Sequence, residues 1–208
     1  MNFVKSLRSI LTLLDNGISY DANYLVRSLY ENYLRIKYVY LDSSRASQIL
    51  GFDAAGSPKS EREPIKLRRP PPFKNIAQSI GELGVFESLY GELSQITHSQ
   101  SVTIKHLLDG EGGFDFLSLN SDFELSTLLT AHEISIRILD CMYEHCSCPN
   151  PFKADLMTAM KRSFGAFLMG WLYVSEMDNC EMSRWSAALV DELSRRHSPL
   201  RKIKAAAR

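Results

Sequence analysis

The chain has 208 residues, of which 45% are hydrophobic and 23% charged, so it can bury a sizeable core and is not disordered overall. Its 24 Lys and Arg residues equal its 24 Asp and Glu residues, which excludes a global field that would direct it to nucleic acid or a membrane. Its four cysteines are typical of a reduced cytoplasmic protein and not of a disulfide scaffold.

The first segment, residues 2–14, has apolar residues at helical spacing and is predicted to form an amphipathic helix. The pair Asn16-Gly17 is a typical helix end. Lys5 and Arg8 interrupt the apolar residues, as the core of a signal peptide does not, so we expect no signal peptide.

A second, long helix is predicted from about residue 22 to 43, with Asp21 as its N-cap. The helical pattern then fails from residue 51 to 73, where five prolines and several small residues indicate a long loop. The loop is basic, and its KLRRPPP stretch could present Arg68 and Arg69 to a partner from an extended polyproline-type segment. The alternative is a solvated loop without a partner.

Four further helices are predicted at 74–98 with a pause at Gly84, at 122–145, at 152–177 and at 182–196. No run with the period-2 alternation of a strand stands out. We therefore predict an all-α bundle of four or five main helices, with one domain over residues 1–197 and a basic tail over 198–208. The longest apolar run has about half of the roughly 20 residues that a membrane-spanning helix needs, so no membrane span is expected.

Two polar triplets repeat at four-residue spacing and are the candidate site. Four residues advance only about 40° around a helix, so Arg27, Glu31 and Arg35 form one stripe. This stripe opposes the aliphatic side of its helix, but three tyrosines share its side, which indicates a helix packed on both sides with Arg27 and Glu31 paired. The alternative is an exposed ion pair, and Arg35 is the residue most typical of plain surface.

The second triplet is Tyr90, Ser94 and His98, which border the apolar arc of their helix. His98 could gain and lose a proton near neutral pH. It also falls at the predicted C-terminus of the helix, where an imidazolium would simply stabilise the helix end, and the sequence leaves both roles open.

The segments LVRSLYENYLRIKYVY and LYGELSQITHSQ resemble a family of uncharacterised bacterial helical proteins, domain of unknown function 5677. The resemblance covers about residues 5–145. Its motifs are Arg-Ser-x-x-Glu, matched by Arg27, Ser28 and Glu31, and Tyr-x-x-Leu-Ser-x-x-x-His, matched from Tyr90 to His98. It implies a general likeness to the HEPN-type helical domains of bacterial toxin and phage-defence systems, without an established activity.

Those domains include ribonucleases with Arg-x(4–6)-His on one helix, where the cation holds the phosphate and His moves the 2′-OH proton. That spacing is absent here. A composite site remains possible, with His98, Arg27 and Glu31 as catalytic residues and Tyr90, Ser94, Arg68 and Arg69 as binding residues. It requires the two motif helices to pack face to face.

A metal site is not expected. Cys141, Cys146 and Cys148 beside His145 lack the paired C-x-x-C spacing of structural zinc sites. His132 lies on an apolar stripe and is interpreted as a core residue that could join a buried polar cluster.

The leading hypothesis is therefore a cytoplasmic helical binding or interaction domain without a cofactor, set in a bacterial toxin or defence system. RNA or a protein would be its partner, and a homodimer is possible. The alternatives are a metal-independent ribonuclease and a purely structural polar network.

Overall fold

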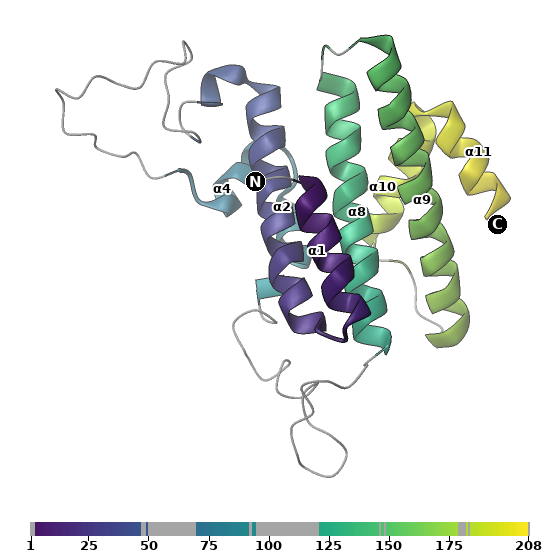
Figure 1. Ribbon diagram of the computed structural model, residues 1–208. Helices are drawn as coiled ribbons and strands as arrows, with labels where there is room; N and C mark the ends of the chain where they lie inside the picture. The colour runs from purple at the N-terminus through teal and green to yellow at the C-terminus, as the bar shows by residue number, and fades with distance from the viewer. Residues whose placement is uncertain are drawn as a thin grey trace.

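The computed structural model describes residues 3–46, 49, 70–91, 93–94, 121–145, 147, 149–178, 182 and 184–207 (Figure 1). These residues form eight α-helices and no strand, which confirms the all-α class, although the helices outnumber the four or five predicted. The α-helices are α1 (Phe3–Asp15), α2 (Ser19–Leu41), α4 (Phe73–Ser79), α5 (Leu83–Val85), α8 (Ser121–His145), α9 (Asn150–Asp178), α10 (Arg184–Arg196) and α11 (Ser198–Ala206). A 3₁₀ turn, η1 (Ser43–Arg45), follows α2, and a π-helical turn, η2 (Phe86–Tyr90), follows α5.

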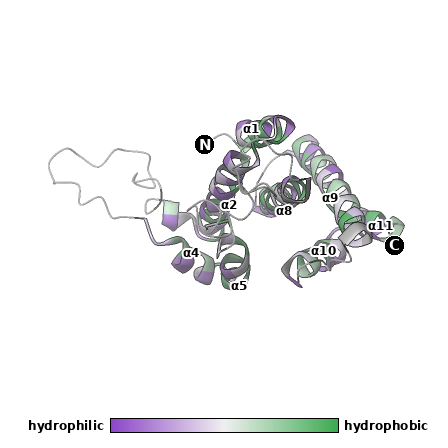
Figure 2. Ribbon diagram, turned by 90° about the horizontal axis from the view of Figure 1, so that it is seen from below, coloured by the Kyte–Doolittle hydropathy of each residue, from purple (hydrophilic) through white to green (hydrophobic). Residues whose placement is uncertain are grey.

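Helices α1, α2, α8 and α9 lie side by side, and α10 and α11 pack beside α9 at the C-terminal end of the chain (Figures 1 and 2). Helix α8 is central because it packs on α2 on one side and on α9 on the other. The short helices α4 and α5 lie against α2, away from α9 (Figure 2).

Helix α8 separates two hydrophobic clusters, one on each of its sides. Ile134 and Ile138 join the cluster formed with α1, α2, α4 and η2, which includes the fully buried Tyr30. Ile136 and Leu139 join the cluster formed with α9, α10 and α11. An α-helix buried on both sides keeps little room for water, so its polar residues must find partners within the protein.

The helix boundaries of the N-terminal half correct the predictions in two places. Helix α2 begins at Ser19, before the predicted cap Asp21, which instead lies in the first turn where a carboxylate favours the helix dipole. The pause after α4 falls at Gly81 and not at Gly84, because Gly81 adopts a positive φ of 74° that glycine accepts without strain. Gly17 adopts a φ of 71° between α1 and α2, at the predicted helix end.

Residues 198–206, predicted as part of a basic tail, form helix α11. Pro199 stands in its first turn, where its fixed φ suits a helix and its missing N–H costs nothing. Leu200 is fully buried, and Ile203 packs beside it against the α9–α10 cluster. The apolar side of this short segment therefore outweighs its basic composition.

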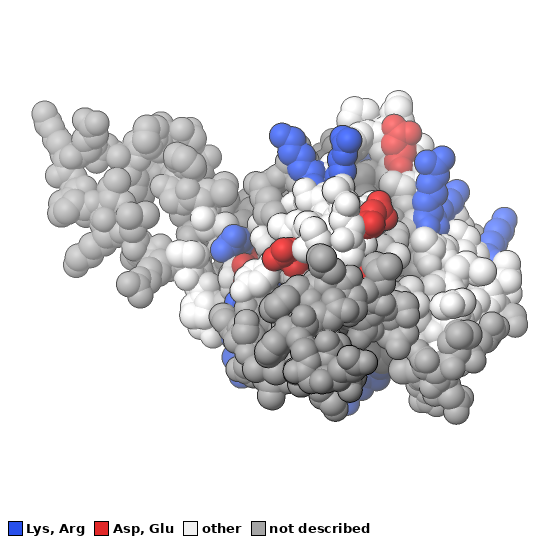
Figure 3. Space-filling view, turned by 60° about the horizontal axis from the view of Figure 1, so that its bottom comes forward, with Lys and Arg blue, Asp and Glu red and all other residues white. Residues whose placement is uncertain are grey.

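The surface carries mixed charge. On the face in Figure 3, basic and acidic side chains of the described residues are interspersed with uncharged ones, in line with the equal totals of the two kinds. Among the described residues, no helix is long and apolar enough to cross a bilayer.

Candidate functional site

The two polar stripes meet where η2 packs on α2. The Arg27 guanidinium donates a hydrogen bond from Nη2 to Tyr90 Oη over 2.8 Å, and the Tyr90 hydroxyl donates to Glu31 Oε1 over 3.2 Å. Arg27 Nε lies 3.4 Å from the same Glu31 oxygen, closing a three-residue ring of contacts. The structure therefore brings together three of the predicted site residues from two separate helices.

Further contacts between arginines and aromatic rings extend from this site to α4. The Arg27 guanidinium lies 4.9 Å from the centre of the Tyr90 ring, and the Arg35 guanidinium lies 4.8 Å from the centre of the Phe73 ring. The Phe73 and Tyr90 rings are neighbours, with centroids 6.2 Å apart, and Tyr90 also stacks on Phe86. Arg35 is thus part of the same cation–aromatic arrangement, which corrects the expectation that it is plain surface.

The arrangement is half-buried and not sealed. Arg27 and Glu31 keep 20% and 21% of their side-chain surface exposed. Solvent therefore reaches both members of this ion pair.

The structure describes some of the remaining predicted site residues and not others. Ser94 is half-buried in the helical segment that follows Tyr90. His98, Arg68 and Arg69 lie outside the described residues, so the composite Arg27–His98 site stays a prediction. His132 is half-buried on α8, and its burial lowers its pKa from the usual 6.5.

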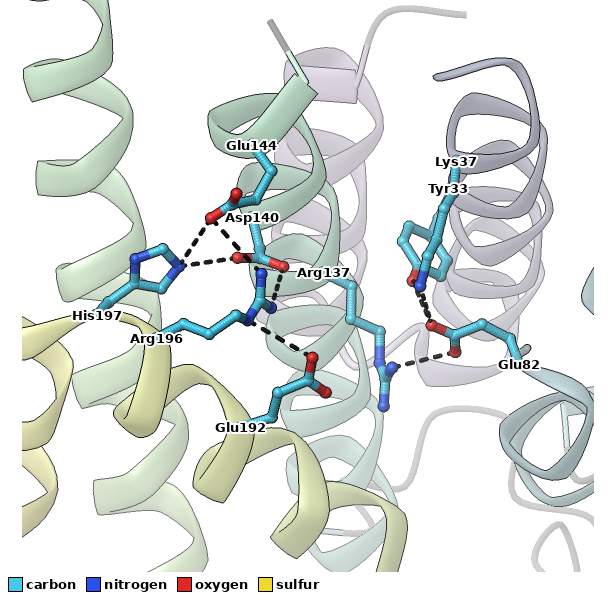
Figure 4. A network of polar contacts seen from close by, with 9 residues as sticks. All are labelled: Tyr33, Lys37, Glu82, Arg137, Asp140, Glu144, Glu192, Arg196 and His197. Carbon is cyan, nitrogen blue, oxygen red and sulfur yellow. Dashed lines mark hydrogen bonds and ion pairs between the residues drawn. The ribbon is translucent and has the colours of Figure 1, made fainter. Parts of the chain in front are cut away.

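The sequence reasoning missed a second polar site, a buried ion-pair cluster around Arg137 (Figure 4). Arg137 donates to Glu133 Oε1 over 2.8 Å from Nη2 and to Glu82 Oε2 over 3.2 Å from Nη1. Glu82 Oε1 accepts from Lys37 Nζ over 2.6 Å and from Tyr33 Oη over 2.7 Å. The i,i+4 pair Glu133–Arg137 within an otherwise apolar helix was the signal that could have revealed it.

The charges of this buried ion-pair cluster compensate one another. Burial alone would raise the pKa of Glu82, but Arg137 and Lys37 hold that pKa below its usual value of 4.5. Burial would lower the pKa of the Arg137 guanidinium, but Glu133 and Glu82 raise it overall. Glu82 and Arg137, each 7% exposed, therefore remain ionised, which a buried charge tolerates only with such partners.

A second group, which we call the C-terminal cluster, consists of Asp140 and Glu144 on α8 with Glu192, Arg196 and His197 (Figure 4). Arg196 Nη2 donates to Asp140 Oδ2 over 2.6 Å, and His197 Nε2 lies 3.0 Å from Asp140 Oδ1. Both clusters line one polar pocket of about 200 Å³. Its lining residues are Tyr33, Lys37, Glu82, Arg137, Asp140, Cys141, Glu144, His145, Leu189, Glu192 and Arg196.

Cys141 and His145, considered above for zinc, both line this pocket. Cys141 is buried, and burial raises the pKa of its thiol to about 11, so the thiolate that a metal or a nucleophilic role requires is scarce at neutral pH. His145 stacks on Tyr40, with ring centroids 5.9 Å apart. Cys146 and Cys148 lie outside the described residues.

Comparison with known proteins agrees with part of the resemblance. The model of a family of unknown function (DUF5677) matches residues 1–59, which include the first motif with Arg27, Ser28 and Glu31 but end before the second. Neither the curated proteins nor the solved structures yield a match. Over its first 59 residues, the chain is thus similar to a family whose function is not known.

Proposed function

We propose that the chain is a helical binding domain whose contact surface is the α2–η2 face, and that single-stranded RNA is the class of partner that this face fits. The observation that carries the proposal is the pair of arginines over neighbouring rings, Arg27 on Tyr90 and Arg35 on Phe73. Proteins bind single strands by combining cations that contact phosphates with planar groups on which bases stack.

Both parts of that chemistry are available on this face. The N–H groups of a guanidinium suit phosphate oxygens and its plane suits stacking, so Arg27 and Arg35 are the kind of side chain that such a partner contacts. Because the chain has no net charge, binding would depend on this local arrangement and not on a global field. The bacterial toxin or defence setting follows from the resemblance and the cytoplasmic location from the cysteine usage, and both belong to the same proposal.

The test is fluorescence anisotropy with a short labelled single-stranded RNA, using the wild type, Arg27→Gln and Arg35→Gln. Arg162→Gln is the matched control, because Arg162 is an exposed arginine on α9. Losing one charged phosphate contact should weaken binding by roughly tenfold and reduce the slope of log K against log salt by about 0.7. The control should match the wild type.

The same reactions distinguish binding from catalysis. RNA that shortens with the wild type but stays intact with Arg27→Ala and His98→Ala would support the composite ribonuclease. If the wild type does not bind RNA at low salt, or if all three Gln variants lose the same affinity, the α2–η2 face is not an RNA site.

A further inference from the structure

Three potential metal ligands converge where α8 meets the junction of α10 and α11. Asp140 and Glu144 are one turn apart on α8, and His197 lies between α10 and α11 (Figure 4). One ligand atom from each of the three lies within 4.8 Å of the others. Among the described residues, this is the group of His, Cys, Asp and Glu side chains close enough to hold one ion.

The spacing suits an ion of the size of Zn²⁺ or Mn²⁺. Metal–ligand bonds of about 2.1 Å in a tetrahedron place neighbouring ligand atoms about 3.4 Å apart. His197 Nε2 lies 3.0 Å from Asp140 Oδ1 and 3.8 Å from Glu144 Oε1, so small side-chain movements would reach that geometry.

The histidine is held in place before any ion binds. Its side chain is 6% exposed, and its ring lies edge-on to Tyr143 with centroids 5.3 Å apart. Its backbone N–H donates to the Leu193 carbonyl, and its own carbonyl accepts from Leu200 N. An imidazole fixed by packing on both sides presents Nε2 to the carboxylates without a large loss of conformational entropy.

The carboxylates of the C-terminal cluster outnumber its guanidinium, which favours a further cation. Asp140, Glu144 and Glu192 surround one guanidinium, that of Arg196, which reaches them over 2.6, 3.6 and 3.5 Å respectively. Arg196 is 31% exposed and is already paired with Glu192 on its own helix, so it can withdraw toward Glu192 and leave the other two carboxylates to an ion.

Asp140 and Glu144 also line the polar pocket of about 200 Å³, which reaches Lys37 and Arg137. An ion held by three protein ligands keeps a position for water or an oxygen of a bound molecule, as in zinc sites that are not purely structural. The pocket gives that position access to solvent and to two fixed cations.

We propose that Asp140, Glu144 and His197 form a binding site for a divalent transition metal, of the kind that one imidazole and two carboxylates prefer, with its open position toward the polar pocket. Arg196 is the competing cation that occupies the carboxylates without the metal. The site is separate from the α2–η2 face and departs from the sequence-based expectation that no metal is bound.

The test titrates Mn²⁺ alone with the metal-free full chain. Binding is measured as the loss of the electron paramagnetic resonance signal of the free ion. Mn²⁺ is chosen because the thiols of the chain bind it poorly. The variants are Glu144→Gln, Asp140→Asn and Arg196→Gln. His145→Ala is the matched control, since this exposed histidine follows Glu144 directly but is not one of the three ligands.

We expect one bound Mn²⁺ per chain in the wild type and in His145→Ala. Glu144→Gln and Asp140→Asn should bind at least about tenfold more weakly, because even outer partners of metal ligands change affinity by 10- to 100-fold. Arg196→Gln should bind more tightly than the wild type. Glu144 is 42% exposed, so Glu144→Gln is expected to fold even where Asp140→Asn does not.

The proposal fails if neither the wild type nor Arg196→Gln binds Mn²⁺. It also fails if folded Glu144→Gln binds as tightly as the wild type, or if His145→Ala loses as much affinity as Glu144→Gln.

Discussion

Tyr30 and Tyr33 lie about one turn apart on α2, so the effect of removing a buried phenolic hydroxyl can be compared at two positions. Both side chains are at most 2% exposed. The Tyr33 hydroxyl donates to Glu82 over 2.7 Å and accepts from Lys37 Nζ over 3.2 Å. The Tyr30 hydroxyl has no hydrogen-bond partner among the described residues. Replacing tyrosine with phenylalanine should therefore lower stability at position 33 but not at position 30.

The magnitudes follow from the partners. A hydrogen bond to a charged group contributes about 1.5–3 kcal/mol, so Tyr33→Phe should lower the free energy of unfolding by about 2 kcal/mol. A buried hydroxyl without a partner costs about 1–3 kcal/mol, so Tyr30→Phe should leave stability unchanged or raise it by about 1 kcal/mol. A difference of about 3 kcal/mol between the variants corresponds to about 6–12 °C in Tm for a chain of this size.

The assay is urea denaturation followed by circular dichroism, with the slope m compared across the wild type and both variants. Equal losses from Tyr30→Phe and Tyr33→Phe would refute the reasoning, because they would show that the Tyr30 hydroxyl is as well satisfied as the Tyr33 hydroxyl. A larger loss from Tyr30→Phe would do so more strongly.

Three further predictions use the same measurement. Gly170→Ala should lower the free energy of unfolding by about 1–3 kcal/mol through overpacking, because the added Cβ would lie 2.5 Å from Leu129. Gly165→Ala should raise it by up to about 1 kcal/mol through helix propensity, because its added Cβ would have no atom closer than 3.9 Å. The pKa of Glu82 is lower in the folded chain than its usual value of 4.5, so below pH 4.5 the unfolded chain binds a proton more readily than the folded chain. Stability should therefore fall as the pH drops below 4.5, and Glu82→Gln should reduce this dependence of stability on pH. Burial lowers the pKa of folded His132 below 6.5, so stability should also decline as the pH falls below that value, and His132→Gln should remove this part.

Each has an outcome that would contradict it. Equal effects of the two glycine substitutions would mean that Leu129 moves aside without cost. An unchanged acid slope in Glu82→Gln would assign the acid sensitivity to other carboxylates. A slope that survives in His132→Gln would point to another histidine.

The long helices were predictable because their apolar residues keep one period over many turns. The predicted ranges 122–145 and 152–177 differ from α8 and α9 by at most two residues at either end. The start of α2 was missed because Ile18, which precedes it, makes no side-chain capping bond, and the prediction relied on such a cap at Asp21. For α11, the basic composition concealed a short apolar side.

Contacts within the candidate site were predictable where both residues lie on the same helix. Arg27 and Glu31 are four residues apart, so their contact follows from helix geometry. The partners of Arg137 were not predictable in the same way, because Glu82 lies 55 residues away and reaches Arg137 only after α5 and α8 have packed. Long-range ion pairs depend on tertiary structure, which periodicity within one segment does not encode.

The π-helical turn η2 lets this segment hold one residue more than a regular α-helix without turning the residues that follow it. A π turn holds one residue more than an α-helical turn, so a one-residue deletion between Phe86 and Tyr90 would restore a regular α-helix and be easily accepted by the backbone. The residues after the deletion would keep nearly the same direction relative to α2, because a π turn and an α turn each complete about one rotation. A homologue with both motifs intact but one residue fewer here would therefore keep Tyr90 facing Arg27.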